Sequence, residues 1–284
     1  MAAYRFCRTD DVPLLVEAYN SCYAVHFPHE PLLTVERFKE AVHDLNLWCS
    51  NCMVAMEDNK PIGVLLAAKR DRGTLIYRLG IASEYQRAGH GRHLLNSLSQ
   101  KLAILGPPTL IAEIPDPWKT GRDFFSACGY TAGTTYADFV LEGVPAPAGN
   151  RDLVTAVSLG DLRESGELNP GQEPSWWRSL KTLENRQERL LGLAVVSDLR
   201  IEAWLLYATD PGDGSLEVLA LGRAPGEQPG ALLGILVRQL AGQDGARVIL
   251  PRISPEEIDF QEVESWGFQR ARDYTRYTAT AAKA

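Results

Sequence analysis

The stretch Leu79-Gly80-Ile81-Ala82-Ser83-Glu84-Tyr85-Gln86-Arg87-Ala88-Gly89-His90-Gly91-Arg92 leads from an apolar strand through a glycine turn into a helix. Glycines at the mouth of a helix let successive backbone N–H groups turn toward one anion. The unpaired amides of the first helical turn and the helix dipole add positive potential there. This order of elements predicts a cradle for phosphate, and a pyrophosphate is the expected guest.

The residues after the turn separate three kinds of nucleotide-binding loop. A P-loop needs Lys and then Ser or Thr after its last glycine, whereas Arg92 and His93 follow Gly91. A dinucleotide fingerprint needs a third glycine where Leu94 stands. The remaining match is Gln86-Arg87-Ala88-Gly89-His90-Gly91, which resembles the Gln/Arg-x-x-Gly-x-Gly/Ala signature of the GCN5-related N-acetyltransferase (GNAT) superfamily.

This resemblance implies a co-substrate, acetyl-CoA, and assigns its contacts. The strand before the turn would offer backbone groups to the pantetheine arm, and the turn would hold the pyrophosphate. The coenzyme-binding residues implied in this way are Leu79, Gly80, Ile81, Gln86, Arg87, Ala88, Gly89, His90, Gly91, Arg92 and, in a later helix, Phe125.

The chain continues as the resemblance requires. Leucines recur at helical spacing from Leu94 to Leu105, and residues 109–114 form an apolar run typical of a buried strand. Residues 125–130 end the next helix at a glycine, and residues 134–141 can close the sheet.

An internal repeat extends this pattern over the second half. A shift of 138 residues places Leu94, Leu98 and Leu102 on further leucines, and Gly129-Tyr130 on Gly267-Phe268. We therefore expect an α/β (α+β) fold with two tandem GNAT-like domains, 1–144 and 151–284. Each domain would have a mixed, mostly antiparallel twisted sheet flanked by helices. The linker is predicted at residues 143–150, which are rich in Pro, Ala and Gly.

The second domain lacks the residues that would bind a phosphate at this turn. The same shift places Gly89 on Glu227, Gly91 on Pro229 and Arg92 on Gly230. A carboxylate repels a pyrophosphate, and proline removes an N–H donor. We expect this degenerate domain not to bind acetyl-CoA in the usual way.

For catalysis, one branch of the superfamily uses a Glu on the strand after the turn as base and a Tyr twelve residues later as acid. Glu113 stands at the first position, but Phe125 stands at the second and cannot donate a proton. We therefore predict that Tyr130 is the general acid that protonates the thiolate, with Tyr136, Tyr77 or water as alternatives. The expected reaction is direct attack on acetyl-CoA, in a ternary complex, by a primary amine of a small molecule or peptide. The alternative from another functional class is a non-catalytic acyl-CoA-binding sensor or scaffold.

Composition limits the partners. The 284 residues carry a net charge of −7, with 45% hydrophobic and 23% charged residues, which is typical of a soluble globular protein and argues against nucleic acid. No apolar run approaches the roughly 20 residues that cross a bilayer, so no membrane association is expected. The odd count of five cysteines and the lack of an apolar leader predict a cytoplasmic location. The sequence does not decide whether the protein is a monomer or a homodimer.

Two clusters suggest a metal site without requiring one. Cys49-Ser50-Asn51-Cys52 has no second ligand pair at zinc-finger spacing, and residues 26–30 fit a polar loop between two helices. No metal is expected.

Overall fold

The computed structural model describes residues 1–28, 31–143, 154–168, 174–197, 200–225, 229–242 and 246–282. It divides into two compact units. Unit 1 is Met1–Gly133 with Thr275–Ala284, and unit 2 is Thr134–Tyr274. The compact units are therefore not the consecutive ranges 1–144 and 151–284, because each unit takes one strand from the other half of the chain. The linker predicted at 143–150 lies outside the described residues, apart from Gly143.

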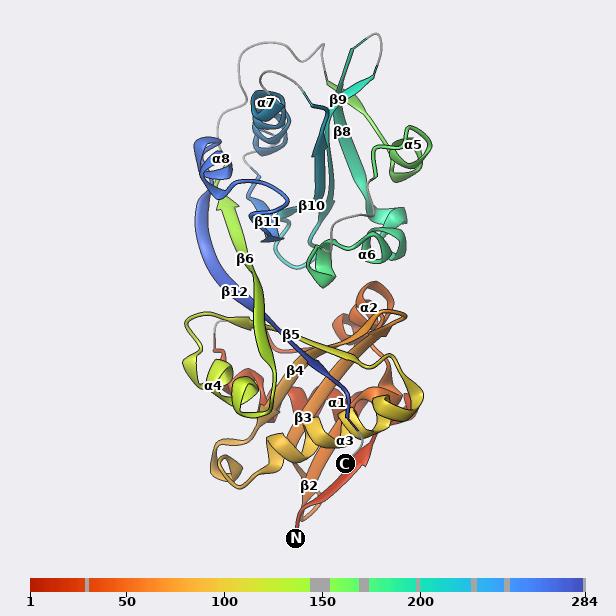
Figure 1. Cartoon of the computed structure of the whole chain (residues 1–284), viewed down its shortest axis with the longest axis vertical. Coiled ribbons are helices and arrows are strands. Elements are labelled where there is room, and N and C mark those ends of the chain that lie inside the picture. The colour runs from red at the N-terminus through yellow and green to blue at the C-terminus, as the bar shows by residue number, and fades with distance from the viewer. Residues whose placement is uncertain are drawn as a thin grey trace. The chain divides into compact units, whose positions relative to one another are not determined.

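Unit 1 is a sheet with helices on both faces (Figure 1). Its strand order is β1-β2-β3-β4-β5-β12. β4 and β5 are parallel. The β1–β2, β2–β3 and β3–β4 pairs are antiparallel. The elements are β1 Ala3–Phe6, α1 Val12–Cys22, α2 Val35–Leu45, β2 Met53–Glu57, β3 Lys60–Arg70, β4 Gly73–Ile81, α3 His90–Leu105, β5 Thr109–Pro115 and α4 Lys119–Ala127, with the short 3-10 helix η2 at Ala24–His26.

Local sequence signals explain where these elements begin and end. The Thr34 side chain caps α2 by accepting a hydrogen bond from the Arg37 N–H at 3.2 Å. Asp58 and Asn59 both have positive φ, 48° and 62°, which suits the tight turn of the β2–β3 hairpin. On α3, the predicted leucines from Leu94 to Leu102 are buried against the sheet, whereas Leu105, at the end of the helix, is exposed.

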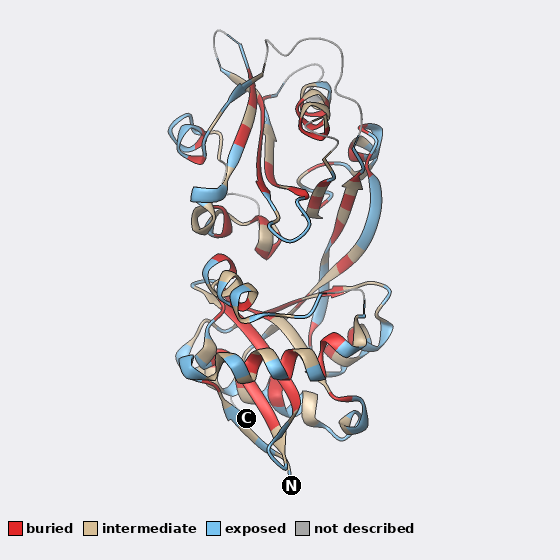
Figure 2. Cartoon of the chain, turned by 180° about the vertical axis from the view of Figure 1, so that it is seen from behind, coloured by how far each residue is buried: buried red, intermediate tan, exposed pale blue. Residues whose placement is uncertain are grey.

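Unit 2 has the order β12-β6-β11-β10-β9-β8-β7. β10 and β11 are parallel, and the β6–β11, β9–β10, β8–β9 and β7–β8 pairs are antiparallel. The elements are β6 Thr131–Leu141, β7 Val154–Ala156, α5 Leu159–Glu164, η6 Trp176–Arg178, α6 Leu180–Asn185, β8 Leu191–Val196, β9 Ile201–Thr209, β10 Leu216–Arg223, α7 Pro229–Ala241, β11 Val248–Ile253, α8 Phe260–Ser265 and β12 Gln269–Thr280. Buried residues follow its strands and the inner side of α7 (Figure 2).

These observations confirm the predicted fold class and the repeat, with one refinement of its register. Thr74 pairs with Leu110 in unit 1, and Leu216 pairs with Val248 in unit 2. The offset is therefore 142 residues between β4 and β10, but 138 between β5 and β11. Gly222 is the structural counterpart of Gly80, and the connection from the strand to the helix is four residues shorter in unit 2.

β12 serves both units with consecutive parts of one strand. Tyr274 belongs to unit 2, where its hydroxyl donates to Asp138 Oδ2 at 2.8 Å. Tyr277 belongs to unit 1, where it is 6% exposed and packs into the core beneath α3. Among the described residues, no helix is long and apolar enough to cross a membrane.

Candidate functional site

A fork between β4 and β5 is the central feature of unit 1. The two parallel strands pair only at Thr74–Leu110 and Leu75–Ile111. β4 continues to Ile81 in antiparallel pairing with β3 alone. Because pairing with β5 stops at Leu75, the backbone of residues 76–81 has no partner in β5. Side chains take two of its carbonyls, that of Tyr77 by Arg78 Nη1 at 2.9 Å and that of Ile81 by Gln86 Nε2 at 3.1 Å.

The predicted strand residues line this fork through their backbones. The side chains of Leu79 and Ile81 pack into the core on the α3 side of the sheet. Gly80 faces the other side, where an added Cβ would lie 2.5 Å from the Cys22 carbonyl oxygen and 2.7 Å from Tyr23 Cα. Glycine is therefore required at this position for α1 to pack on the strand.

The end of β4 is tied to the neighbouring loops. The Ile81 carbonyl accepts a hydrogen bond from Gln86 Nε2 at 3.1 Å and lies 2.9 Å from His26 Nε2. Gln86 belongs to the predicted turn, whereas His26 lies in η2. Together they fix where the strand ends and the turn begins.

The turn has the geometry of an anion cradle, defined here as residues 86–92. Arg87 and Gly89 adopt positive φ of 64° and 89°, and Gly89 is the N-cap of α3 with no side chain capping it. Arg87, Ala88 and Gly89 are exposed, and an added Cβ on Gly89 would meet no atom within 4 Å. The N–H groups of the first turn of α3 have no acceptor within the helix, and the space beside Gly89 is open.

The charge around the cradle is suited to a phosphate. Arg87 and Arg92 are exposed guanidinium groups. The Arg92 Nη2 also donates to the Ala127 carbonyl at the end of α4, at 3.2 Å. His90 Nδ1 lies 2.6 Å from the Tyr4 hydroxyl, which orients this first ring of the helix. The two guanidinium groups add to the positive end of the α3 dipole.

Phe125 and Tyr130 lie in the core and not in the cradle. Phe125 is 2% exposed, and its ring meets that of Tyr130 edge-on, with centroids 5.1 Å apart. Burial raises the pKa of Tyr130, and its hydroxyl has no hydrogen-bond partner among the residues that the structure describes. The neighbouring Phe124, in contrast, reaches Gly91, where an added Cβ would lie 3.2 Å from Cζ.

Glu113 lies on the face of the sheet opposite to Tyr130. Leu110, Ala112 and Ile114 of β5 point into the α3-side core that also holds Tyr130. Side chains alternate along a strand, so Glu113 points to the other face, which it shares with Gly80. The structure thus brings Glu113 to the fork but does not place the two predicted catalytic residues together.

Sequence reasoning missed an aromatic row beside the fork. Ring centroids are 5.0 Å apart for Tyr19 and Tyr23, 4.6 Å for Tyr23 and Phe27, and 5.4 Å for Phe27 and Trp118. The row connects α1 and η2 with the residue that precedes α4. Tyr19, Tyr23 and Phe27 recur at a spacing of four residues, a local signal that could have been noticed. Trp118 is distant in sequence, and no local motif places it in the row.

The cysteines show no sign of reactivity or metal binding. All five are free, and burial raises the pKa of Cys7 to about 12 and that of Cys52 still further. Within the described ranges, no group of His, Cys, Asp and Glu side chains could hold a metal ion. His29 and Glu30 lie outside those ranges.

Comparisons with known proteins agree with this geometry. Residues 12–130 match the profile of the acetyltransferase (GNAT) family. The chain is similar to a GCN5-related N-acetyltransferase from Sphaerobacter thermophilus, with 14% identity, a TM-score of 0.73, and coverage of 99% of this chain and 96% of that one. It is also similar to a tandem GNAT protein of the clavulanic acid biosynthesis pathway, with 14% identity, a TM-score of 0.70 and full coverage of both chains. A search of curated protein sequences gave no significant match.

Proposed function

Because the chain is a tandem-domain member of the GNAT superfamily, we propose that unit 1 is an acetyl-CoA-dependent N-acetyltransferase acting on a primary amine. The observation that supports this proposal most is that the fork and the cradle follow each other directly along the chain. The fork between β4 and β5 offers strand backbone, and the same strand leads directly into the cradle at the start of α3. A thioester arm along the strand and a diphosphate in the cradle fit that order.

Acetyl transfer depends mainly on how the protein positions the amine and the thioester, and it needs no covalent intermediate with the protein. The amine nitrogen attacks the thioester carbonyl carbon, the C–S bond breaks, and the thiolate takes up a proton as the ammonium proton leaves. Holding amine and thioester together supplies about 7–11 kcal/mol of the barrier lowering. The bonds at Ile81 and the packing at Gly80 provide such rigidity on the coenzyme side.

Glu113 is the proposed general base because it lies on β5 at the fork, on the face of the sheet opposite to the α3-side core. A carboxylate there can accept the amine proton directly or through one water. Tyr130 remains the acid proposed from sequence, although its buried hydroxyl lies on the other face of the sheet. Protonation of the thiolate by water is the alternative that this placement favours.

A charge reversal in the cradle tests the coenzyme site. Gly89→Glu puts a carboxylate where the diphosphate is proposed to bind, without a clash in the protein, and should weaken acetyl-CoA binding at least tenfold in isothermal titration. Gly166→Glu is the matched control, because Gly166 also has positive φ, 76°, and open space around it. Equal affinity in both variants would contradict the proposed site.

The release of free thiol from acetyl-CoA decides between enzyme and sensor. We expect turnover with at least one acceptor in a panel of small amines and peptides, and its loss in Gly89→Glu. Tight acetyl-CoA binding with no turnover on any acceptor would instead favour an acyl-CoA sensor.

A further inference from the structure

Unit 2 contains the same kind of fork as unit 1. β10 and β11 pair only at Leu216–Val248 and Glu217–Ile249, and then separate. Each fork also has one extra residue in its first strand, Tyr77 in β4 and Leu219 in β10. The early separation of the two parallel strands in unit 1 is therefore preserved in unit 2.

Arg178 fills the fork of unit 2. Its side chain has no exposed surface, and Nη1 donates to the Val218 carbonyl at 2.7 Å and to the Pro251 carbonyl at 3.4 Å. Val218 lies on β10 and Pro251 on β11, so one guanidinium bridges the two separating strands. By the offsets of 142 and 138, these carbonyls correspond to those of Ile76 and Glu113 in unit 1.

Glu257 holds the guanidinium in place. Its carboxylate accepts from Arg178 Nε at 2.9 and 3.1 Å, and it also pairs with Nη2. A ligand entering the fork would have to displace Arg178 and leave Glu257 without its cation. Removing one partner of a buried ion pair is strongly unfavourable, so the fork resists an incoming ligand.

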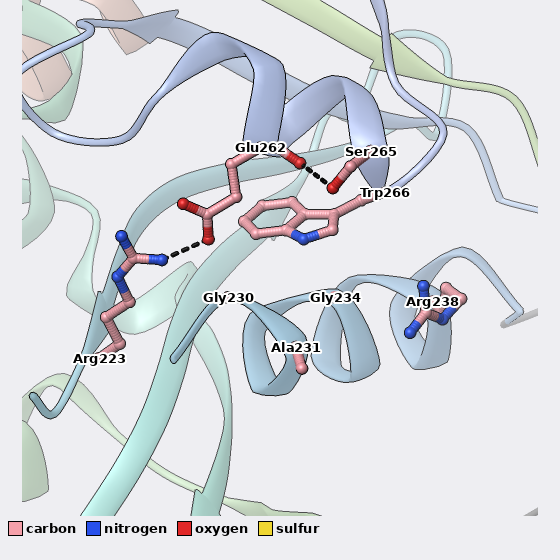
Figure 3. A pocket seen from close by; sticks show the side chains of 8 residues that line it. All are labelled: Arg223, Gly230, Ala231, Gly234, Arg238, Glu262, Ser265 and Trp266. Carbon is pink, nitrogen blue, oxygen red and sulfur yellow. Dashed lines mark hydrogen bonds and ion pairs between the residues drawn. The ribbon is translucent and has the colours of Figure 1, made fainter. Parts of the chain in front are cut away.

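A second ion pair lies where α7 begins. Glu262 of α8 pairs with Arg223, the last residue of β10 and the counterpart of Ile81. The Glu262 side chain lies so close to Gly230 that a Cβ there would clash with it. Arg223 and Glu262 line a cavity of about 480 Å³ together with Arg238 of α7 and Trp266, the residue that follows α8. Figure 3 shows Arg238 farther along α7 than Gly230. A carboxylate of the chain itself thus stands beside the first turn of this helix.

We propose that these two ion pairs are built-in substitutes for a coenzyme. Arg178–Glu257 occupies the position of the thioester end, and Arg223–Glu262 occupies that of the diphosphate. Unit 2 is then a scaffold that folds complete without ligand, and the chain carries one coenzyme site. This inference rests on the proposed function of unit 1, since it assigns unit 2 by the positions that coenzyme takes there.

The number of sites on the full chain tests the inference. We expect isothermal titration to give one acetyl-CoA per chain, and Gly89→Glu to weaken binding at that site at least tenfold. Two sites in the wild type, one of which keeps its affinity in Gly89→Glu, would overturn the inference and leave the proposed function standing. No binding to the wild-type chain would overturn both.

Amide hydrogen exchange tests the part played by Arg178 directly. Arg178→Met should speed exchange in residues 248–253 at least tenfold without ligand, while acetyl-CoA still binds at one site. Arg163→Met is the control, because Arg163 pairs with Glu184 in the same unit and is 54% exposed. Exchange as slow in Arg178→Met as in the wild type would refute the assignment. If Arg178→Met does not fold, the wild-type protein provides the test. Slower amide exchange of residues 248–253 when acetyl-CoA is added would then refute the assignment.

Discussion

Two tyrosines three residues apart on β12 are expected to stabilise different units. Tyr277 is buried in unit 1 although it lies near the end of the chain, and Tyr274 is buried in unit 2. Replacing either by alanine leaves a cavity in one core only. We therefore predict that Tyr277→Ala weakens the coenzyme-binding unit and that Tyr274→Ala does not.

The size of the effect follows from burial. Tyr277 is 6% exposed and packs with the α3-side core. Truncating a buried aromatic side chain costs about 3–5 kcal/mol of unfolding free energy. For a unit of this size, that loss lowers the melting temperature by roughly 10–15 °C.

Scanning calorimetry with and without acetyl-CoA assigns each change to a unit. A ligand at 100 times its Kd stabilises the unit that binds it by about 2.7 kcal/mol, which marks the transition of unit 1. Tyr277→Ala should lower that transition, whereas Tyr274→Ala should lower the other. Thr280→Ala is a control, because Thr280 is an exposed residue of the same strand.

Two results would refute this reasoning. One is a coenzyme-responsive transition that Tyr277→Ala leaves unchanged. The other is a single transition that both tyrosine variants lower equally, since β12 would then not divide its contribution between the units.

Three further predictions concern stability. Gly80→Ala should destabilise unit 1 by about 1–3 kcal/mol in urea unfolding, because the new methyl meets the Cys22 carbonyl oxygen; an unchanged midpoint would refute the packing argument. Arg178→Met should cost unit 2 about 3–5 kcal/mol, and adding Glu257→Gln should recover part of it, whereas simple addition of the two losses would contradict a coupled pair. Hydrogen bonds from the Arg5 side chain and the Arg8 N–H lower the pKa of Asp11 to about 2, below its unfolded value of about 3.9. The ionised Asp11 therefore adds to the free energy of unfolding in full above pH 4, and this stabilisation is lost as pH falls toward 2. Acid unfolding of Asp11→Asn should show a smaller dependence on pH in that window, and an unchanged dependence would exclude this role.

Much of the fold was predictable from the repeat. The leucine stripe of α3 recurs in α7, and the glycine that ends α4 recurs after α8, because helices and their caps leave periodic signals. The cradle was also predictable, since positive φ at Gly89 and a helix start at His90 follow from the glycine pattern. These features depend on neighbouring residues alone.

Features that depend on distant residues were not predictable. A single shift of 138 does not align Gly80 with Gly222, because the four-residue difference falls between the strand and the helix. The exchange of β6 and β12 leaves no trace either, since an alternating strand does not state which neighbour it will pair with. Arg178 follows two tryptophans, but nothing nearby in the sequence marks the carbonyls that it reaches 40 and 73 residues away.

The exchange of strands sets an order of events on the ribosome. The segment that completes unit 1, residues 275–284, is translated after all of unit 2. At 5–20 residues per second, the nascent chain waits on the order of 10 s between the two. During that delay β5 has an open edge, where another strand could pair. Newly made unit 1 therefore keeps this edge unpaired until its own last strand is synthesised.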